Sequence, residues 1–570
     1  MKLSKLLGER TKETPSSATV KSQAYLMRAG YIKQVSNGIY SMLPPAQKVS
    51  LKIQNIIREE MNRIGGQEVL FPVVMPREMW DESGRYTSIG SEMVRFKDRT
   101  GHDMLLGMTH EEAAVHMAKN IVKSYEQLPF MIYQIQTKFR DEARSRAGLI
   151  RVREFTMKDA YSFHTSQEDL EAYYKKVYDA YFRIYKRIGL KNVIAVASDS
   201  GMMGGKVAHE YMLLTDIGED SIAICDNCDY KANVEVAKGI LDKNHCERES
   251  LEEVYTGEAK SIEEVCKMLN VAPSQTCKAV CYAIEGEQEK SLIVFVRGDL
   301  DVSEAKVKVV IGKDIVPKDL DSTSLVKGNI GPMAINDKNI IALFDESLKN
   351  ENSLVCGANK DKYHIKGVCI ERDIPNVVYY DLSKVKDGEI CPICGKGKLT
   401  ISRGVEIGNI FQLGTKYTTP MQMMVQMANG EEMNPIMGCY GIGIGRNIAC
   451  IAEESADEKG LVWNMNVAPW EVIISPLRQD DEVVSEKTVH LYNELKNNNI
   501  DVIVDDRAVS AGVKFADSEL LGVPVRVVIS PRSLQEGSVE ISFRQSGEKI
   551  MLKYDEAAEY LTQFVRDSKF

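Results

Sequence analysis

Several features that assign proteins to special classes are missing from this sequence. It contains no run of about 20 apolar residues, so we expect no transmembrane helix and no membrane partner. Its first residues, MKLSKLLGERTKE, show no apolar segment followed by a cleavage site, so we expect no secretory signal. Internal repeats and low-complexity tracts are also lacking. Together these absences predict a globular protein of the cytoplasm.

An excess of basic residues is lacking as well. The 570 residues include 72 Lys and Arg against 82 Asp and Glu, which gives a formal net charge of −10. This balance argues against a general basic coat for nucleic acid, but it allows a local basic patch on an acidic enzyme. What remains is an ordinary composition, 44% hydrophobic and 27% charged, and a length that predicts three or four domains.

The sequence contains twelve cysteines, and four of them form two C-x2-C pairs. Without a secretory signal we expect a reducing compartment, where paired cysteines suggest a metal before a disulfide. Cys225 with Cys228, and Cys391 with Cys394, have the spacing of a structural Zn²⁺ site. The interval between the pairs is long for a zinc ribbon, but the two ends of an inserted domain return to nearly the same place. We predict bound zinc, with buried free thiols as the alternative.

Two long helices and a strand hairpin are predicted in the first third of the chain. Apolar residues at helical spacing predict a helix over 46–64, and QEVLFPVVMP at 67–76 follows it as one strand. A second helix begins at Ser166, where Ser166 and Asp169 suit a capping box. Between the helices, residues 131–142 and 151–164 read as strands joined by a long charged loop.

The rest of the chain changes character twice. Residues 225 to about 405 carry their own strands and helices between the two cysteine pairs, as expected of a domain inserted into another domain. From about residue 467, strands and helices alternate in the order β-α-β-α-β, which predicts a small α/β domain.

The hairpin is the first segment that suggests a specific chemistry. It concentrates basic residues against only two acidic ones, namely Lys138, Arg140, Arg144, Arg146, Arg151 and Arg153 against Asp141 and Glu142. Arginine binds phosphate oxygens through paired donors, and the ring of Phe155 could stack on a nucleobase. The alternative is a solvated basic loop.

The sequence GCYGIGIGR at 438–446 is the second such segment. Its glycines do not have the G-x-G-x-x-G spacing of a dinucleotide-binding turn. Gly441, Gly443 and Gly445 instead alternate with isoleucines, so a strand would present one bare face and one apolar face. A flat ligand can approach the bare face, and Arg446 then opens a helix. The alternative is a tightly packed glycine strand. With the hairpin, this segment predicts a nucleotide site.

Both segments resemble signature motifs of a known family. FRDE followed by REF resembles motif 2 of the class II aminoacyl-tRNA synthetases, GIGIGR resembles motif 3, and the helix ending in EVLFPVV resembles motif 1. MTHEEA, NIFQLGTKY and GCYGIGIGR further resemble the bacterial-type prolyl-tRNA synthetases. The resemblance implies an α+β multidomain fold: a class II antiparallel sheet at 1–224 and 406–466, an inserted α/β editing domain at 225–405, and an α/β anticodon-binding domain at 467–570.

The resemblance also implies a reaction, in which proline and ATP form prolyl-adenylate and the prolyl group passes to tRNA(Pro), with Mg²⁺ as the metal partner of ATP. The implied catalytic residues are Arg140 and Arg446. The implied ATP-binding residues are Arg140, Glu142, Arg151, Phe155, Gly443 and Arg446. The implied proline-binding residues are Thr109, Glu111, Arg140, Gln412, Thr415, Cys439 and Gly441. Glu111 could alternatively be a polar residue of a helix's first turn, and Cys439 a small buried hydrophobic residue.

An editing activity is implied because alanine fits a proline pocket and is hard to reject by size alone. The implied editing domain would hydrolyse alanyl-tRNA(Pro), and its implied residues are Lys278, Gly331, Asp345 and His364. His364 would help to position the tRNA terminus or the alanyl ester, and Lys278 would contact the tRNA end. Alternatively, Lys278 is a solvated helix residue and His364 a loop histidine. A homodimer is implied by motif 1, because the apolar face of that helix and strand would otherwise be exposed. Two alternatives remain: a class II synthetase for another amino acid, and a tRNA-binding paralogue without enzymatic activity.

Overall fold

The computed structural model describes residues 1–199, 201–205, 207–244, 246–318, 325–335 and 337–569. The chain forms two compact units. The first comprises residues 1–194, 202–217 and 405–570, and the second comprises 195–201 and 218–404. Among the described residues, every helix is too short or too polar to span a bilayer.

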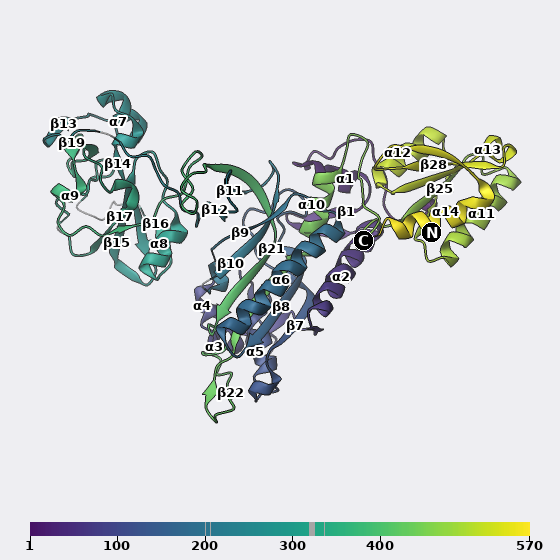
Figure 1. The fold of residues 1–570 in the computed structure, drawn as a ribbon, viewed down its shortest axis with the longest axis horizontal. Helices are drawn as coiled ribbons and strands as arrows, with labels where there is room; N and C mark the ends of the chain where they lie inside the picture. The colour runs from purple at the N-terminus through teal and green to yellow at the C-terminus, as the bar shows by residue number, and fades with distance from the viewer. Residues whose placement is uncertain (200, 206, 245, 319–324, 336, 570) are drawn as a thin grey trace. The chain divides into compact units, whose positions relative to one another are not determined.

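An antiparallel sheet forms the centre of the first unit (Figure 1). Four strands are neighbours in the order β21–β24–β8–β7, and β3 joins β7 in parallel at the edge. Their bounds are Leu399–Gly414, Ile436–Gly443, Glu154–His164, Phe130–Phe139 and Gly66–Glu68, of which only residues 405–414 of β21 belong to this unit. The hairpin predicted at 131–142 and 151–164 is confirmed as β7 paired with β8. The expected antiparallel sheet is therefore present.

Two long helices cover one face of this sheet. They are α2 (Pro44–Arg63) and α6 (Gln167–Ile188), with α10 (Ile444–Ser455) and α1 (Lys21–Arg28) packed beside them. The predicted stripe of α6, from Leu170 to Ile188, is buried. The Ser166 hydroxyl caps α6 by accepting a hydrogen bond from the Asp169 amide, but the Asp169 carboxylate accepts from His164 instead of completing a capping box. The prediction of both helices is confirmed. Of the predicted capping box, the Ser166 cap is present and the reciprocal bond from Asp169 is not.

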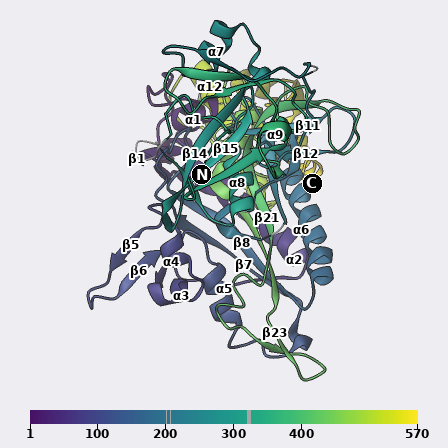
Figure 2. The ribbon, with the colours of Figure 1, turned by 90° about the vertical axis from the view of Figure 1, so that its left-hand side faces the viewer.

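The segment 67–76 is not one strand. Gly66–Glu68 pairs with β7, whereas Val74–Pro76 (β4) pairs with β6 (Asp103–Leu106) in a separate sheet that β5 (Arg95–Lys97) completes. Figure 2 shows β5 and β6 beside α3 (Arg77–Glu82) and α4 (Arg85–Ser88), with α5 (Glu111–Ala118) nearby. The prediction of one strand was wrong, because residues 69–73 leave the first sheet to reach the second.

The end of the first unit has the predicted β-α-β-α-β order. Strands β26, β25 and β27 (Val502–Val504, Val472–Pro476, Val525–Ile529) are parallel, and β28 and β29 (Ser538–Phe543, Lys549–Lys553) continue the sheet antiparallel. Helices α11 (Glu482–Asn497), α12 (Ala511–Leu521) and α14 (Tyr554–Asp567) accompany these strands. Their apolar residues form a core of their own around Val472, Val527 and Leu561.

The second unit contains two sheets and a short root. Five strands are arranged β16–β14–β15–β17–β20 (Ile315–Pro317, Cys277–Ile284, Glu287–Arg297, Ile340–Asp345, Tyr379–Tyr380), and three are arranged β13–β19–β18 (Glu252–Tyr255, Tyr363–Val368, Leu354–Gly357). Helices α7 (Ile262–Leu269) and α8 (Glu304–Ile311) belong to this part. We call residues 220–240 and 383–404 the root; they include β11 (Asp220–Cys225), β12 (Lys231–Asn233) and residues 399–404 of β21.

Candidate active site

Strand register brings the two predicted binding regions onto one face of the first unit's sheet. Cys439 of β24 lies between Phe411 and Tyr161, while two residues further on Gly441 lies between Asn409 and Asp159. Directly opposed residues of antiparallel strands share a face, and successive residues on that face are about 7 Å apart. Cys439, Gly441 and Gly443 therefore lie at consecutive positions on one surface of the sheet, apolar at Cys439 and without a β24 side chain at the two glycines.

A cavity of about 110 Å³ lies over Gly441 and Gly443. Its lining comes from the hairpin, from β21 and from the glycine strand: Arg140, Glu142, Leu149, Ile150, Arg151, Val152, Phe155, Met157, Glu406, Ile407, Gly408, Asn409, Gly441, Gly443 and Arg446. All six residues that were predicted to bind ATP are in this set. The cavity has apolar walls with three guanidinium groups, which suits a base attached to phosphates.

Arg140 and Arg446 contribute positive charge to the same cavity. Arg140 is held by the Met108 carbonyl, to which its Nε donates at 3.2 Å, and its guanidinium carbon lies 5.4 Å from the centre of the Phe155 ring. Burial lowers the pKa of Arg140, the Glu406 carboxylate opposes this, and Arg446 lowers the pKa further. An anionic ligand would relieve the repulsion between the two guanidinium groups.

Arg446 is fixed by main-chain oxygens. Its Nε donates to the Ile150 carbonyl at 2.8 Å and its Nη1 to the Glu406 carbonyl at 2.8 Å. Its helix, α10, begins at Ile444, so Gly445 lies inside the helix and only Gly441 and Gly443 belong to the bare strand. The prediction that Arg446 opens the helix was two residues late.

Glu142 and Arg151 face each other across the charged loop. Nη2 of Arg151 donates to Oε1 of Glu142 at 3.0 Å, and the same oxygen accepts from the Arg144 amide at 2.9 Å. The pair closes one side of the cavity, so the loop predicted to be charged is ordered by its own ion pair.

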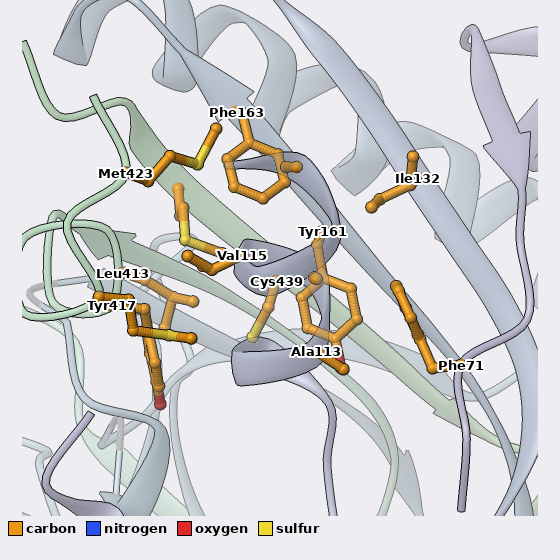
Figure 3. Packing of buried hydrophobic residues seen from close by; sticks show 14 of the residues in the cluster. Phe71, Ala113, Val115, Ile132, Tyr161, Phe163, Leu413, Tyr417, Met423 and Cys439 are labelled. Atoms are coloured by element: carbon orange, nitrogen blue, oxygen red, sulfur yellow. The ribbon is translucent and has the colours of Figure 1, made fainter. Parts of the chain in front are cut away.

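The other end of the surface is apolar and enclosed. Figure 3 shows Cys439 between Leu413 and Tyr417 on one side and Tyr161 on the other. All four side chains are buried and belong to one hydrophobic cluster. Burial raises the pKa of the Cys439 thiol well above its ordinary range, and the nearby Glu111 carboxylate adds to this rise, so the thiol is neutral.

Thr109 and Glu111 supply polar groups to this apolar end. The Thr109 hydroxyl donates to Oε2 of Glu111 at 2.6 Å, and Nη1 of Arg85 lies 3.3 Å from the same oxygen. Among the described residues, Oε1 of Glu111 meets no donor in hydrogen-bond geometry, although the atom is buried. A buried carboxylate oxygen without a partner is costly, so it is ready for a cationic ligand group.

Two predicted proline-binding residues are not brought to this end. The side-chain oxygen of Gln412 accepts from Gln167 of α6 at 2.8 Å, on the opposite face of β21 from Phe411 and Leu413. Thr415 is exposed in the turn that follows β21. Alternation along the strand explains the first case, because Gln412 follows Phe411 and so points to the helices.

The four predicted editing residues lie in the second unit. Gly331 packs directly against the Gly357 main chain, and Gly357 pairs with His364 in the three-stranded sheet. Nδ1 of His364 is 2.7 Å from the Thr256 hydroxyl, and burial lowers the pKa of this histidine.

Lys278 and Asp345 lie in the five-stranded sheet instead. Lys278 forms an ion pair with Asp301 at 3.0 Å. The carboxylate of Asp345 accepts main-chain hydrogen bonds from Ser347 and Leu382, at 2.9 and 2.7 Å. Both carboxylate oxygens of Asp345 are therefore engaged in holding the local chain.

The two cysteine pairs meet in the second unit. The sulfur atoms of Cys225, Cys228, Cys391 and Cys394 all lie within 4.8 Å of one another. The prediction that the ends of the insertion bring them together is confirmed, while the identity of a bound ion stays a prediction.

Sequence reasoning missed several residues of the first unit's site. Arg85 is buried, contacts both Glu111 and Glu112, and lies over the rings of Trp80 and Tyr417. Nothing near Arg85 in the sequence signals this role. Glu406 and Asn409 line the cavity because β21 pairs with β24, and only the register of that long-range pairing could have identified them.

The comparisons agree with this architecture. A family model described as "tRNA synthetase class II core domain (G, H, P, S and T)" matches residues 94–455, and one described as "Anticodon binding domain" matches residues 471–564. With the antiparallel sheet, the glycine strand and the arginine-lined cavity, they define a class II aminoacyl-tRNA synthetase.

Relatives narrow the class to one family. The proline–tRNA ligase of Bacillus cytotoxicus is 42% identical over 99% of this chain and 100% of its own length, and that of Caldicellulosiruptor saccharolyticus is 41% identical over 100% and 99%. A prolyl-tRNA synthetase from Cryptosporidium parvum, solved with L-proline and AMP, shares the fold with a TM-score of 0.58 at 14% identity, covering 99% of this chain and 78% of its own. The chain belongs to the proline–tRNA ligases, the aminoacyl-tRNA synthetases that attach proline to its tRNA.

Proposed function

We propose that the surface between Cys439 and Arg446 binds proline and ATP side by side and catalyses the formation of prolyl-adenylate. The nucleotide occupies the cavity, with adenine between Phe155 and the bare strand at Gly443, and with phosphates at Arg140, Arg151 and Arg446. Glu142 faces the adenine edge. Supporting this assignment, all of these residues line one cavity.

Proline occupies the apolar end of the same surface. Its ring packs at Cys439, and its ammonium group binds the open Oε1 of Glu111, which Thr109 and Arg85 hold in place. Gly441 lies between the two ends and leaves room for the atoms that react. The observation that carries the proposal is the position of Cys439, which the buried Glu111 carboxylate approaches, one strand step from Gly441 in the arginine-lined cavity.

The chemistry needs positioning and charge rather than a side-chain nucleophile. The proline carboxylate attacks the α-phosphate, and pyrophosphate leaves. Since both reactants are anionic, guanidinium groups that are fixed before the reaction stabilise the transition state without reorganisation. Mg²⁺ would add charge neutralisation for the phosphates, and the Glu406 carboxylate in the lining suits that ion. The four-cysteine cluster has no part in these steps.

Substitution of Arg140 tests the proposal. Arg140→Ala should reduce proline-dependent exchange of pyrophosphate into ATP by at least about a hundredfold, because a fixed charge at the reacting phosphate is lost. Arg144→Ala is the matched control, since Arg144 lies in the same loop but is exposed and does not line the cavity. Wild-type exchange by a folded Arg140→Ala protein would refute the assignment. Exchange with another amino acid would favour a different specificity.

We also propose that the second unit hydrolyses alanyl-tRNA(Pro). A pocket shaped for proline discriminates against the smaller alanine by only about 1–3 kcal/mol, so a second site is needed. Support comes from the contact of Gly331 with Gly357 and from the pairing of Gly357 with His364, so that two of the predicted residues each adjoin Gly357. The buried, neutral His364 would orient the ester or the tRNA end.

Deacylation of alanyl-tRNA(Pro) tests this second activity. His364→Ala should lower the rate of hydrolysis at least tenfold and leave proline-dependent exchange unchanged. Lys366→Ala, two residues along the same strand, is the control that should hydrolyse at the wild-type rate. Undiminished hydrolysis by His364→Ala would remove His364 from the editing site.

A homodimer is the assembly that we propose, on revised grounds. The apolar stripe of α2 is already buried within its own chain, at Val49, Ile53 and Ile57 among others, so its exposure was a wrong expectation. The segment after it supports the proposal instead. Leu70 and Val74 are 69% and 43% exposed, and β3 ends the strand order of the described sheet with an open edge.

A further inference from the structure

The root of the second unit carries a group of side chains that the reaction does not use. Cys225 and Cys228 flank the turn between β11 and β12, and Cys391 and Cys394 lie in a second turn, closed by the bridge between Ile390 and Lys398. We infer that these four thiolates bind one structural Zn²⁺ ion, which fastens the chain where it enters the second unit to the chain where it leaves.

The sulfur positions fit the metal. Zinc–sulfur bonds of about 2.3 Å in a tetrahedron place the sulfur atoms about 3.8 Å apart. The Cys225 and Cys394 sulfurs are 3.7 Å apart, and the Cys228 and Cys391 sulfurs are 3.6 Å apart. These separations are far longer than a disulfide bond of about 2.05 Å.

The two turns are built like metal-binding knuckles. The Asn227 amide donates to Sγ of Cys225 and the Gly397 amide to Sγ of Cys394, both at 3.3 Å. Main-chain donors of this kind stabilise thiolates and orient them toward an ion. A Cβ atom at Gly397 would lie 2.5 Å from the Cys225 sulfur, so the second turn can approach the first only because residue 397 is glycine.

The surrounding core is too small to hold the root alone. It consists of eight buried residues, two of which are cysteines of the cluster itself: Ala223, Cys225, Ala232, Val234, Ala237, Val385, Cys391 and Leu399. Small cores of this kind commonly need a metal or a disulfide for stability. Four cysteine ligands leave no open position, so the ion would be structural rather than catalytic.

The consequence is that the long segment between the pairs is tied at its base. Cys228 and Cys391 are 163 positions apart in the sequence, and the intervening chain forms the two sheets of the second unit. Without the ion, the thiols would not connect the two chain ends. The ends would then be held together only by the pairing of Cys225 with Leu399 and by the neighbouring strand contacts. Loss of the ion should therefore make the root less ordered.

Metal analysis of the full-length protein, purified without chelator, tests the inference. The wild type should contain one zinc per chain, and Cys228→Ser with Cys391→Ser should lose it. Cys246→Ser is the control, because Cys246 is a half-buried cysteine of the same unit that lies outside the cluster. Metal-free wild type, iron in place of zinc, or full zinc content in the double variant would each overturn the proposal.

Measurements on the wild type avoid dependence on a variant that fails to fold. Blocking the thiols with a mercurial should release one zinc per chain to a colorimetric chelator, and Co²⁺ exchanged into the site should show the absorption of tetrahedral thiolate coordination. Removing the metal should increase protease cleavage within 218–240 and 383–404. Release of no zinc, or a cobalt spectrum of octahedral type, would contradict a four-thiolate site.

Discussion

At the scale of single residues, the two faces of the glycine strand have different tasks. Gly441 and Gly443 face the cavity, whereas Gly438 faces α6, where a Cβ atom would clash with the Tyr440 hydroxyl. The sequence alone indicated the bare face through alternation, because strand periodicity is a local property. It could not show which glycine faces ligand and which faces protein, since that depends on the elements packed on each side.

Because Gly443 faces the cavity and Gly438 faces protein, substituting them should affect different properties, namely ATP binding for Gly443 and stability for Gly438. A Cβ atom at Gly443 would be 3.8 Å from its nearest neighbour, so Gly443→Ala should melt like the wild type but raise the KM for ATP about tenfold by filling the nucleotide space. Gly438→Ala should instead lower stability by about 1–3 kcal/mol through overpacking. Melting temperatures and exchange kinetics measure both effects. An unchanged KM for ATP in Gly443→Ala would place adenine elsewhere.

At the scale of elements, helices were predicted better than strands. The α6 stripe follows from 3.6-residue periodicity and its start from a capping serine, both of which are contained in a short window of sequence. The segment 67–76 failed because its two halves pair with β7 and β6, partners that no local pattern identifies. In the same way, Arg85 and Glu406 join the site only through contacts distant in sequence.

The interface between α6 and the sheet contains a buried lysine with a testable pH response. Lys158 of β8 donates to the Tyr181 hydroxyl at 2.6 Å and to the Tyr440 carbonyl at 3.0 Å, and burial lowers its pKa from 10.5 to about 7. Between these two values the unfolded chain binds more protons than the folded chain, so stability attributable to Lys158 increases as the pH rises from about 7 toward 10.

Replacing the lysine should remove this response. Relative to Lys158→Met, the wild type should gain up to about 1.4 kcal/mol of unfolding free energy per pH unit in that window. The difference in melting temperature between the two proteins, followed from pH 6.5 to 9.5, measures the gain. Lys176→Met, at an exposed position of α6, should keep the wild-type dependence. Parallel curves for wild type and Lys158→Met would show that Lys158 does not titrate in this range.

At the scale of the whole molecule, assembly follows from what the single chain leaves uncovered. The α2 stripe predicted to form an interface is satisfied inside the chain, because α6, α10 and the sheet cover it. The periodic pattern revealed an apolar face but not the identity of its partner. The segment that follows α2 is not covered in the same way, since Leu70 and Val74 are exposed and β3 has an open edge.

If a second copy covers this segment, charge placed there should separate the subunits. Leu70→Asp combined with Val74→Asp should convert a dimer into a monomer in light scattering at micromolar concentration, because two carboxylates would be desolvated in each half of the interface. Val483→Asp is the control, since Val483 is 56% exposed on α11, outside this segment. A dimer that survives the double substitution would locate the interface on another surface, and a monomeric wild type would exclude the dimer itself.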